Sequence, residues 1–184
     1  MSNFMENSVP TFSAVFKDAI SAENAYNLAI QKGYKKEDIN ILMSEDTKSK
    51  NYGSRLQNSA TSPSVASATH DAAEGAGVGG VIGTTAGALA AAIAAIGTNL
   101  VIPGLGLVIA GPIAAAFAGA GAGGIAGGVI GALVNAGLTE SDATKYETAL
   151  NEGGIVISIK PHSEEEAKLI SNEWKAFGGS HFSS

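Results

Sequence analysis

Apolar and polar positions alternate in two short runs near the N-terminus, with a helical pattern between them. Residues 12–16 and 39–44 place apolar side chains at every second position, as a strand with one buried face does. Between these runs, apolar residues over 22–29 recur at the spacing of one helical face. Ser21 is a suitable N-cap for this helix, and Gly33 is a suitable stop. The pattern therefore predicts a strand, a helix and a second strand.

The C-terminal part of the chain has a similar organisation. Thr139 is positioned to cap a short helix, and residues 155–159 alternate Ile with Val or Ser as a strand does. Ser163 and Glu166 have the spacing of a capping box, in which each side chain binds a backbone group near the other. A helix is expected to run from there to Gly178, and the last five residues are expected to add a short strand.

The two flanks together have the element order of a ferredoxin-like sandwich, with a long insertion between its second and third strands. We therefore expect an α+β fold in which residues 1–44 and 139–184 form one cap, with helices on one face of an antiparallel sheet. Each half alone would expose the apolar side of its strands, so the two are expected to fold together. Residues 45–71 are rich in Ser, Asn, Thr and Lys and are expected to be a flexible polar linker.

The remaining segment, residues 72–138, has a very different composition. From Gly75 to Thr139, 65 consecutive residues lack Asp, Glu, Lys, Arg and His, and they hold 18 of the 24 glycines. We call this stretch the neutral tract. All charged residues lie outside it, and the formal net charge of the chain is −6. This acidic balance argues against a protein that binds nucleic acid, which would need a basic surface.

Glycine recurs at every fourth residue in two series within the neutral tract. Four-residue spacing places these glycines on one face of a helix, where two backbones can approach closely. Each glycine costs about 1 kcal/mol relative to alanine in a helix, so two such series indicate a packing surface. The expected packing positions, including one upstream extension of the second series, are Gly75, Gly79, Gly83, Gly87, Gly111, Gly119, Gly123, Gly127 and Gly131.

Between the two series lies a segment in which Pro and Gly are dense enough to break a helix and turn the chain. The predicted turn residues are Pro103, Gly104, Gly106 and Pro112. The interpretation is a glycine-zipper hairpin of two antiparallel helices over about 73–97 and 113–137. Each would be roughly 35–37 Å long, near the ~30 Å hydrocarbon core of a bilayer. We expect this hairpin to insert into a membrane; the alternative is a soluble homo-oligomer whose hairpins bury each other.

Candidate chemistry is sparse. There is no cysteine, which excludes a disulfide framework, a thiolate metal site and a cysteine nucleophile. The pattern G-x-G-x-x-G occurs from Gly75 and from Gly119, but neither copy has the preceding strand and following acid of a dinucleotide site. His70 and Glu74 lie four residues apart without a third metal ligand nearby. We therefore expect no catalytic, cofactor-binding or metal-binding residues, and no enzymatic activity.

Several segments resemble the bacterial general-stress and low-temperature-induced proteins, in which a glycine-zipper segment interrupts a small α/β domain. The similar segments, in order, are INILMSEDT from Ile39, AEGAGVGGVIG from Ala73, IPGLGLVIAGPI from Ile102, LTESDATKYE from Leu138 and GGIVIS from Gly153. The resemblance covers most of residues 12–160, and Pro-Gly-Leu-Gly followed by Ala-Gly-Pro is its most specific part. It implies a stress-linked protein associated with the cell envelope, and it supplies no catalytic residues.

The sequence thus predicts a non-enzymatic, stress-associated protein that self-assembles and associates with membrane lipid through its hairpin. It is expected at the cell membrane with the cap in the cytoplasm, or alternatively free in the cytoplasm. Two other functions remain open: a soluble homo-oligomer, and a small-ligand sensor whose cap signals through the hairpin. No cofactor and no nucleic-acid partner are expected.

Overall fold

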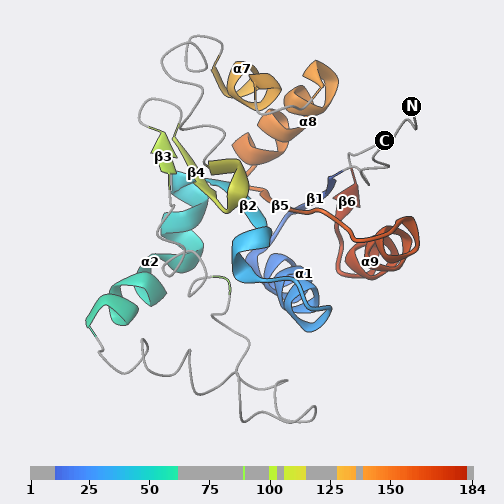
Figure 1. Ribbon diagram of the computed structural model, residues 1–184. Coiled ribbons are helices and arrows are strands. Elements are labelled where there is room, and N and C mark those ends of the chain that lie inside the picture. Colours follow the sequence, from blue (N-terminus) through green and yellow to red (C-terminus); the bar gives the residue numbers. More distant parts are fainter. Residues whose placement is uncertain are drawn as a thin grey trace, which may run out of the picture.

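The computed structural model describes residues 11–61, 89, 100–102, 106–114, 128–135 and 139–181. They form a six-stranded sheet with the order β3-β4-β2-β5-β1-β6, in which every neighbouring pair is antiparallel (Figure 1). The strands are β1 (Phe12–Phe16), β2 (Asn40–Ser44), β3 (Leu100–Ile102), β4 (Leu107–Ala110), β5 (Ile155–Ile159) and β6 (Ser180–His181). The helices are α1 (Ala19–Gln31), α2 (Glu45–Thr61), α7 (Gly128–Asn135), α8 (Glu140–Asn151) and α9 (Glu164–Ala176). The fold is α+β, as the sequence predicted.

The two flanks of the chain share this sheet. Strands β1 and β2 come from the first flank, and both pair with β5 of the second flank. Ile157 in β5 lies opposite Ala14 on one side and opposite Ile41 on the other. Because the central strand is supplied by one flank and its neighbours by the other, neither flank can complete the sheet alone. The expectation that the flanks fold together agrees with this pairing.

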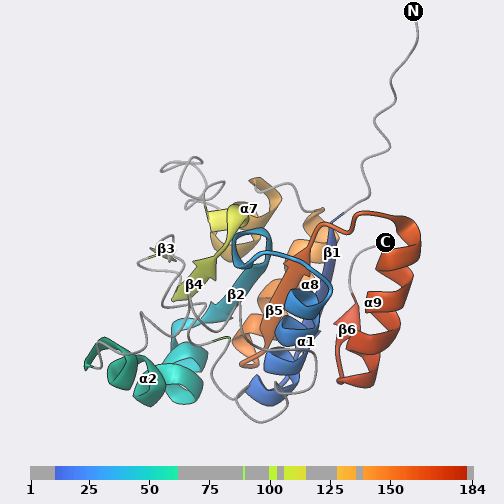
Figure 2. The ribbon, with the colours of Figure 1, turned by 60° about the horizontal axis from the view of Figure 1, so that its bottom comes forward.

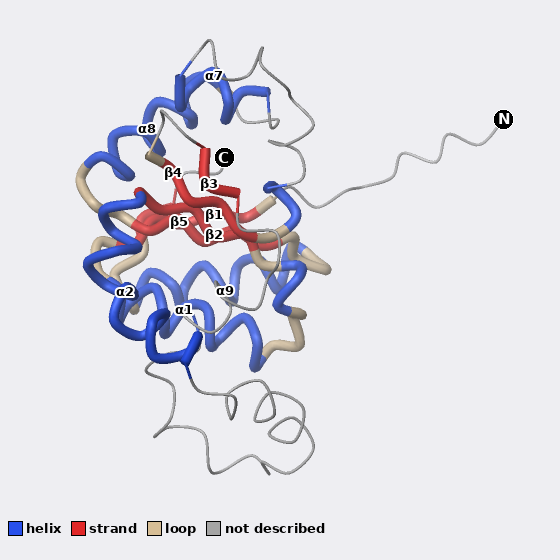
Figure 3. Tube along the Cα trace, turned by 90° about the vertical axis from the view of Figure 1, so that its left-hand side faces the viewer, coloured by secondary structure: helices blue, strands red, loops and turns tan. Residues whose placement is uncertain are grey.

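One face of the sheet is covered by α1, α2 and α9 (Figure 3), and Figure 2 shows α1 over the strands with α9 beside it. The core on this side centres on Trp174, whose side chain is only 1% exposed. Its ring centroid lies 5.1 Å from that of Phe12 and 5.7 Å from that of Phe16. The indole N–H donates to the carbonyl oxygen of Ala25 at 3.2 Å. Trp174 therefore ties α9 to both β1 and α1.

The opposite face of the sheet is covered by α7 and α8 (Figure 3), which corrects the expectation of helices on one face only. The side chains that alternate with the first core are also apolar, and Val15, Leu42 and Val156 form a second core with Leu133 of α7 and Tyr146 of α8. Strands β1 and β5 are consequently buried along their whole length. A strand whose two faces are both apolar needs a layer on each side.

The segment expected to be a flexible linker over 45–71 instead begins with helix α2, so that prediction is wrong for residues 45–61; the rest lies outside the described residues. Ser44 starts the helix, because its hydroxyl accepts a hydrogen bond from the backbone N–H of Thr47 at 3.1 Å. Two acidic residues lie in the first turn, where the helix dipole favours negative charge. Tyr52 then enters the first core and is fully buried.

The middle of the neutral tract is a β-hairpin rather than the turn of a helical hairpin. Strands β3 and β4 pair with each other, and β4 pairs with β2 over Ile41–Ser44. The expected boundary between the cap and residues 72–138 is therefore wrong, since β3 and β4 belong to the sheet of the cap. The run Leu107–Ala110 is short, apolar and rich in branched residues, which suits a buried strand as well as a helix.

One of the two long helices predicted for the neutral tract also needs correction. The predicted helix over 113–137 is not continuous, because Gly128 has a positive φ of 66° and α7 begins there. Of the predicted helix over 73–97, only Leu89 is described; it is helical and buried in the first core. In the part of the chain that the structure describes, no helix has both the length and the apolar character needed to cross a bilayer.

Helix α1 begins earlier than the sequence suggested. Its N-cap is Asp18 rather than Ser21, and the Asp18 carboxylate accepts hydrogen bonds from the backbone N–H and the hydroxyl of Ser21, both at 2.8 Å. The caps predicted at Thr139 and Ser163 are correct, since each accepts from the backbone N–H three residues later. The hydrogen bond from the Ser21 backbone, against a smaller effect of burial, lowers the pKa of Asp18.

We expect the variant Asp18→Asn to make the free energy of unfolding less dependent on pH at acidic pH. Because the pKa of Asp18 is lower in the folded than in the unfolded state, the charged cap contributes stability above about pH 4 and loses it as the pH falls through the folded pKa. Asn caps a helix equally well without titrating. The wild type should be more stable than the variant by about 0.5 kcal/mol at pH 7, and this difference should vanish at pH 2. Urea unfolding at both pH values measures it, and parallel profiles would contradict the assignment.

Candidate functional site

Most of the residues predicted as packing or turn positions lie outside the described residues. These are Gly75, Gly79, Gly83, Gly87, Pro103, Gly104, Gly119, Gly123 and Gly127. The four that are described do not form one surface. Gly106 lies in the turn before β4, Gly111 and Pro112 follow β4, and Gly131 lies within α7. Gly106, Gly111 and Pro112 lie at the junction between the neutral tract and β2, and we call this junction the seam.

Gly111 has a different role from the one predicted. It does not extend a helical glycine series, because its φ is +95°, a conformation that only glycine adopts readily. Its backbone lies directly against the start of β2: a Cβ atom here would overlap the carbonyl oxygen of Ile39 and lie 2.9 Å from the Cα of Asn40. Gly111 is therefore required for close approach between two backbones at the seam.

Hydrogen bonds hold the seam at both ends of β4. At one end the backbone N–H of Glu45 donates to the carbonyl oxygen of Gly106 at 2.7 Å. At the other end the backbone N–H of Ile113 donates to the side-chain oxygen of Asn40, also at 2.7 Å. Both contacts join the neutral tract to β2 or to the residue directly after it, so the position of the tract depends on β2.

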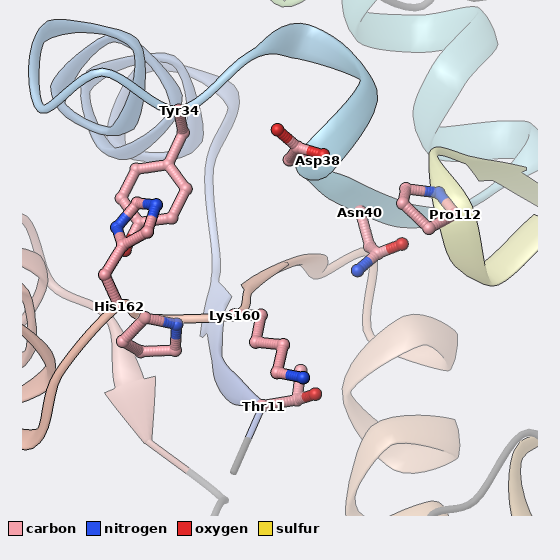
Figure 4. Close-up of a pocket in the computed structure, with 8 residues that line it drawn as sticks. Thr11, Tyr34, Asp38, Asn40, Pro112, Lys160 and His162 are labelled. Atoms are coloured by element: carbon pink, nitrogen blue, oxygen red, sulfur yellow. The ribbon is translucent and has the colours of Figure 1, made fainter. Parts of the chain in front are cut away.

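A cleft of about 600 Å³ opens beside the seam, at the end of the sheet where strands β1 and β2 begin and strand β5 ends (Figure 4). This volume lies in the range typical of sites for small molecules. Four separate segments line the cleft: the residue before β1, the connection from α1 together with the first residue of β2, the turn after β4, and the connection from β5 to α9. The lining residues are Thr11, Tyr34, Asp38, Asn40, Pro112, Lys160, Pro161 and His162.

His162 and Tyr34 form one wall of the cleft. Their rings are stacked with centroids 4.9 Å apart and planes tilted by 34° (Figure 4). The carboxylate of Glu166 accepts from the His162 backbone N–H and lies 2.9 Å from the ring Nδ1, so Nδ1 carries a hydrogen and Nε2 is left for other partners. Partial burial opposes ionisation of Glu166, but the hydrogen bonds from His162 outweigh it and lower the pKa of Glu166. Burial, with the nearby charge of Glu166, raises the pKa of Tyr34 to about 12.

A polar row crosses the sheet next to the cleft. Ser158 in β5 lies opposite Ser13 in β1 on one side and opposite Asn40 in β2 on the other. Ser13 and Ser158 are both buried, and Ser13 has a hydrogen bond with Tyr146 of α8. This row lies at the end of the second apolar core, and its member Asn40 also lines the cleft.

Pro112 is the one cleft residue that the sequence analysis singled out, as a turn position, and no cleft residue was predicted to bind a ligand. One signal was nevertheless present: Thr11 precedes β1, Asn40 begins β2 and Lys160 follows β5. Because β5 runs antiparallel to both neighbouring strands, these three positions lie at the same end of the three strands. Recognising this requires the strand order, which the separate alternating runs do not contain.

The comparisons with known proteins add no assignment to the cleft. No family model, no curated protein and no solved structure matches the chain. Within the described ranges, no three His, Asp or Glu side chains are grouped so that they could hold a metal ion. The cleft residues instead provide hydrogen-bond donors, a carboxylate and a flat ring surface. Groups of these kinds bind polar small molecules.

Proposed function

We propose that this chain is a non-enzymatic, stress-associated protein that self-assembles through its neutral tract, with the α+β cap holding that tract in place. The stress association is what the resemblance to the general-stress proteins implies. For the cap we propose a ferredoxin-like core made of β1, β2, β5 and β6 with α1 and α9. The strand order β2-β5-β1-β6 and the antiparallel pairing support this assignment. Strands β3 and β4 extend the sheet beyond β2.

The observation that carries the proposal is the division of the neutral tract between the two faces of the sheet. Leu89, two residues after the first glycine series, is buried in the core under α1 and α9. Leu133, two residues after the second series, is buried in the core under α7 and α8. Leu89 and Leu133 thus lie on opposite sides of the sheet, which argues against pairing of the two glycine series with each other within one chain. We therefore expect the glycine series to contact a second copy of the chain.

The edge of the sheet gives additional support for assembly. Strand β3 is the outermost strand, and within the described residues no strand pairs with its outer side. It consists of Leu100, Val101 and Ile102 and carries no charge. Exposed edge strands usually contain charged residues or proline that prevent pairing with another chain. An uncharged edge strand favours pairing between copies.

Bulky substitution in a glycine series should disrupt assembly. We expect Gly123→Leu to hold the paired backbones apart and to shift the protein to smaller species, whereas Ile125→Leu keeps the side-chain volume and should leave the assembly unchanged. Sedimentation velocity of both variants and the wild type measures the size. Equal distributions for all three proteins would contradict the glycine series as an assembly surface, as would a wild-type protein that is monomeric.

Membrane association is a second candidate function, favoured by the length of the charge-free tract. A hairpin that crosses a bilayer would carry its turn to the side opposite the cap, but β3 and β4 of this segment pair with the cap sheet. Self-assembly is therefore the primary proposal, with the cap on the cytoplasmic side in either case. Carbonate extraction of a membrane pellet separates the two, because a bilayer-spanning protein stays in the pellet whereas a protein held by its own copies does not.

A further inference from the structure

The cleft beside the seam carries two opposite charges on different sides. The carboxylate of Asp38 lies at one side and the ammonium of Lys160 at the other, and Thr11 also lines the cleft (Figure 4). Within the described part of the chain, neither Asp38 nor Lys160 forms an ion pair. The two charges are thus held apart across a concave site and do not neutralise each other directly.

The amide of Asn40 has a fixed orientation between these charges. A backbone N–H can only donate, so the atom that faces Ile113 at 2.7 Å is the amide oxygen. The amide nitrogen of Asn40 consequently points into the cleft (Figure 4), where it can donate two hydrogen bonds. Three side chains of the lining can therefore donate a hydrogen bond to a ligand, through the ammonium of Lys160, the amide nitrogen of Asn40 and the hydroxyl of Thr11.

We propose that this cleft binds the zwitterion of a free amino acid. The carboxylate of the ligand is bound by Lys160, Thr11 and the amide nitrogen of Asn40, because these groups can all donate to an anionic oxygen. The ammonium group of the ligand faces Asp38. The side chain of the ligand lies along the stacked rings of Tyr34 and His162.

The charge arrangement favours this ligand class over simpler ions. A small anion can pair with Lys160 alone and a small cation with Asp38 alone, so neither ion contacts both charged groups. A ligand with both charges satisfies both sides at once. The volume of about 600 Å³ accommodates an amino acid together with bound water. The proposal does not depend on self-assembly, since every residue in it belongs to one chain.

The full-length protein can be tested with three forms of each ligand. The twenty common L-amino acids are first compared by differential scanning calorimetry, and those that raise the melting temperature are measured by isothermal titration calorimetry. Each is then compared with its N-acetyl derivative, which lacks the ammonium group, and its methyl ester, which lacks the carboxylate. We expect the free amino acid to bind at least tenfold more tightly than either derivative. Failure of all twenty to bind, or equal binding of the derivatives, would overturn the proposal.

Two variants assign the charges to their residues. Asp38→Asn should weaken binding of the free amino acid at least tenfold but leave binding of the N-acetyl derivative unchanged, because that derivative has no ammonium group to lose. Lys160→Met should weaken the free amino acid at least tenfold and leave the methyl ester unchanged. Lys168→Met, an exposed change on α9, serves as the control and should bind as the wild type does. If Asp38→Asn weakens all three ligand forms equally, the ammonium does not lie at Asp38 and the proposal fails.

Discussion

Replacing Gly111 by alanine should reduce the free energy of unfolding by about 3 kcal/mol. Two effects add at this position. The backbone has a φ of +95°, which strains an L-residue by about 1–2 kcal/mol. The new methyl group would also overlap the carbonyl oxygen of Ile39 and force β4 away from β2, and overpacking of this kind costs about 1–3 kcal/mol. Urea unfolding followed by the fluorescence of Trp174, the single tryptophan, measures the loss.

Gly33 provides a matched control for this prediction. Its φ of +96° is almost the same as that of Gly111, but a Cβ atom at Gly33 would meet nothing within 4 Å. Gly33→Ala should therefore show the backbone strain alone, about 1–2 kcal/mol. Equal losses in the two variants would mean that the close approach of Gly111 to β2 does not contribute to stability. The seam would then not hold the neutral tract as described.

The alternating runs of the flanks were read correctly because each signal is local and strong. Residues 12–16 and 155–159 place one set of side chains in the core under α1 and α9, as their period of two predicted. Thr139 and Ser163 were recognised as caps because a helix start depends on only a few neighbouring residues. What these runs could not show was that the other set of side chains is buried as well, since Val15 and Val156 suit either environment.

The described middle of the neutral tract differs from the predicted helical hairpin for a physical reason. Glycine has no side chain to bias the backbone, so its spacing is compatible with a helix face and also with turns of positive φ, as at Gly106 and Gly111. The run Leu107–Ala110 is apolar throughout and has no period that separates strand from helix. Its conformation is decided by pairing with β2, which lies more than 60 residues earlier in the chain. Such a distant partner leaves no trace in a local pattern.

The cleft could not be predicted for a related reason. Its residues come from four segments that are brought together only by the strand order, and no two of the charged or ring-bearing groups have a spacing typical of a site. Lys160 and His162 flank Pro161, and this pattern indicates only the end of a strand. In the sequence, Asn40 occupies a polar position of an alternating strand pattern. In the structure, its side-chain oxygen accepts a hydrogen bond from the backbone N–H of Ile113. Polar residues at strand ends become informative once the order of the strands is known.

Leu133→Ala should reduce the free energy of unfolding by about 3 kcal/mol, because the side chain is fully buried between α7 and the sheet and its removal leaves a cavity. Val134→Ala is the matched control: this neighbour on the same helix is 41% exposed, and its loss should change stability by less than about 0.5 kcal/mol. Trp174 reports both variants from the opposite face of the sheet. The fluorescence of Trp174 reports the loss of stability caused by Leu133→Ala only if α7 and the cap unfold as one cooperative unit. If Leu133→Ala leaves the Trp174 transition unchanged, the end of the neutral tract folds separately from the cap, and the division of the tract between the two faces cannot support self-assembly.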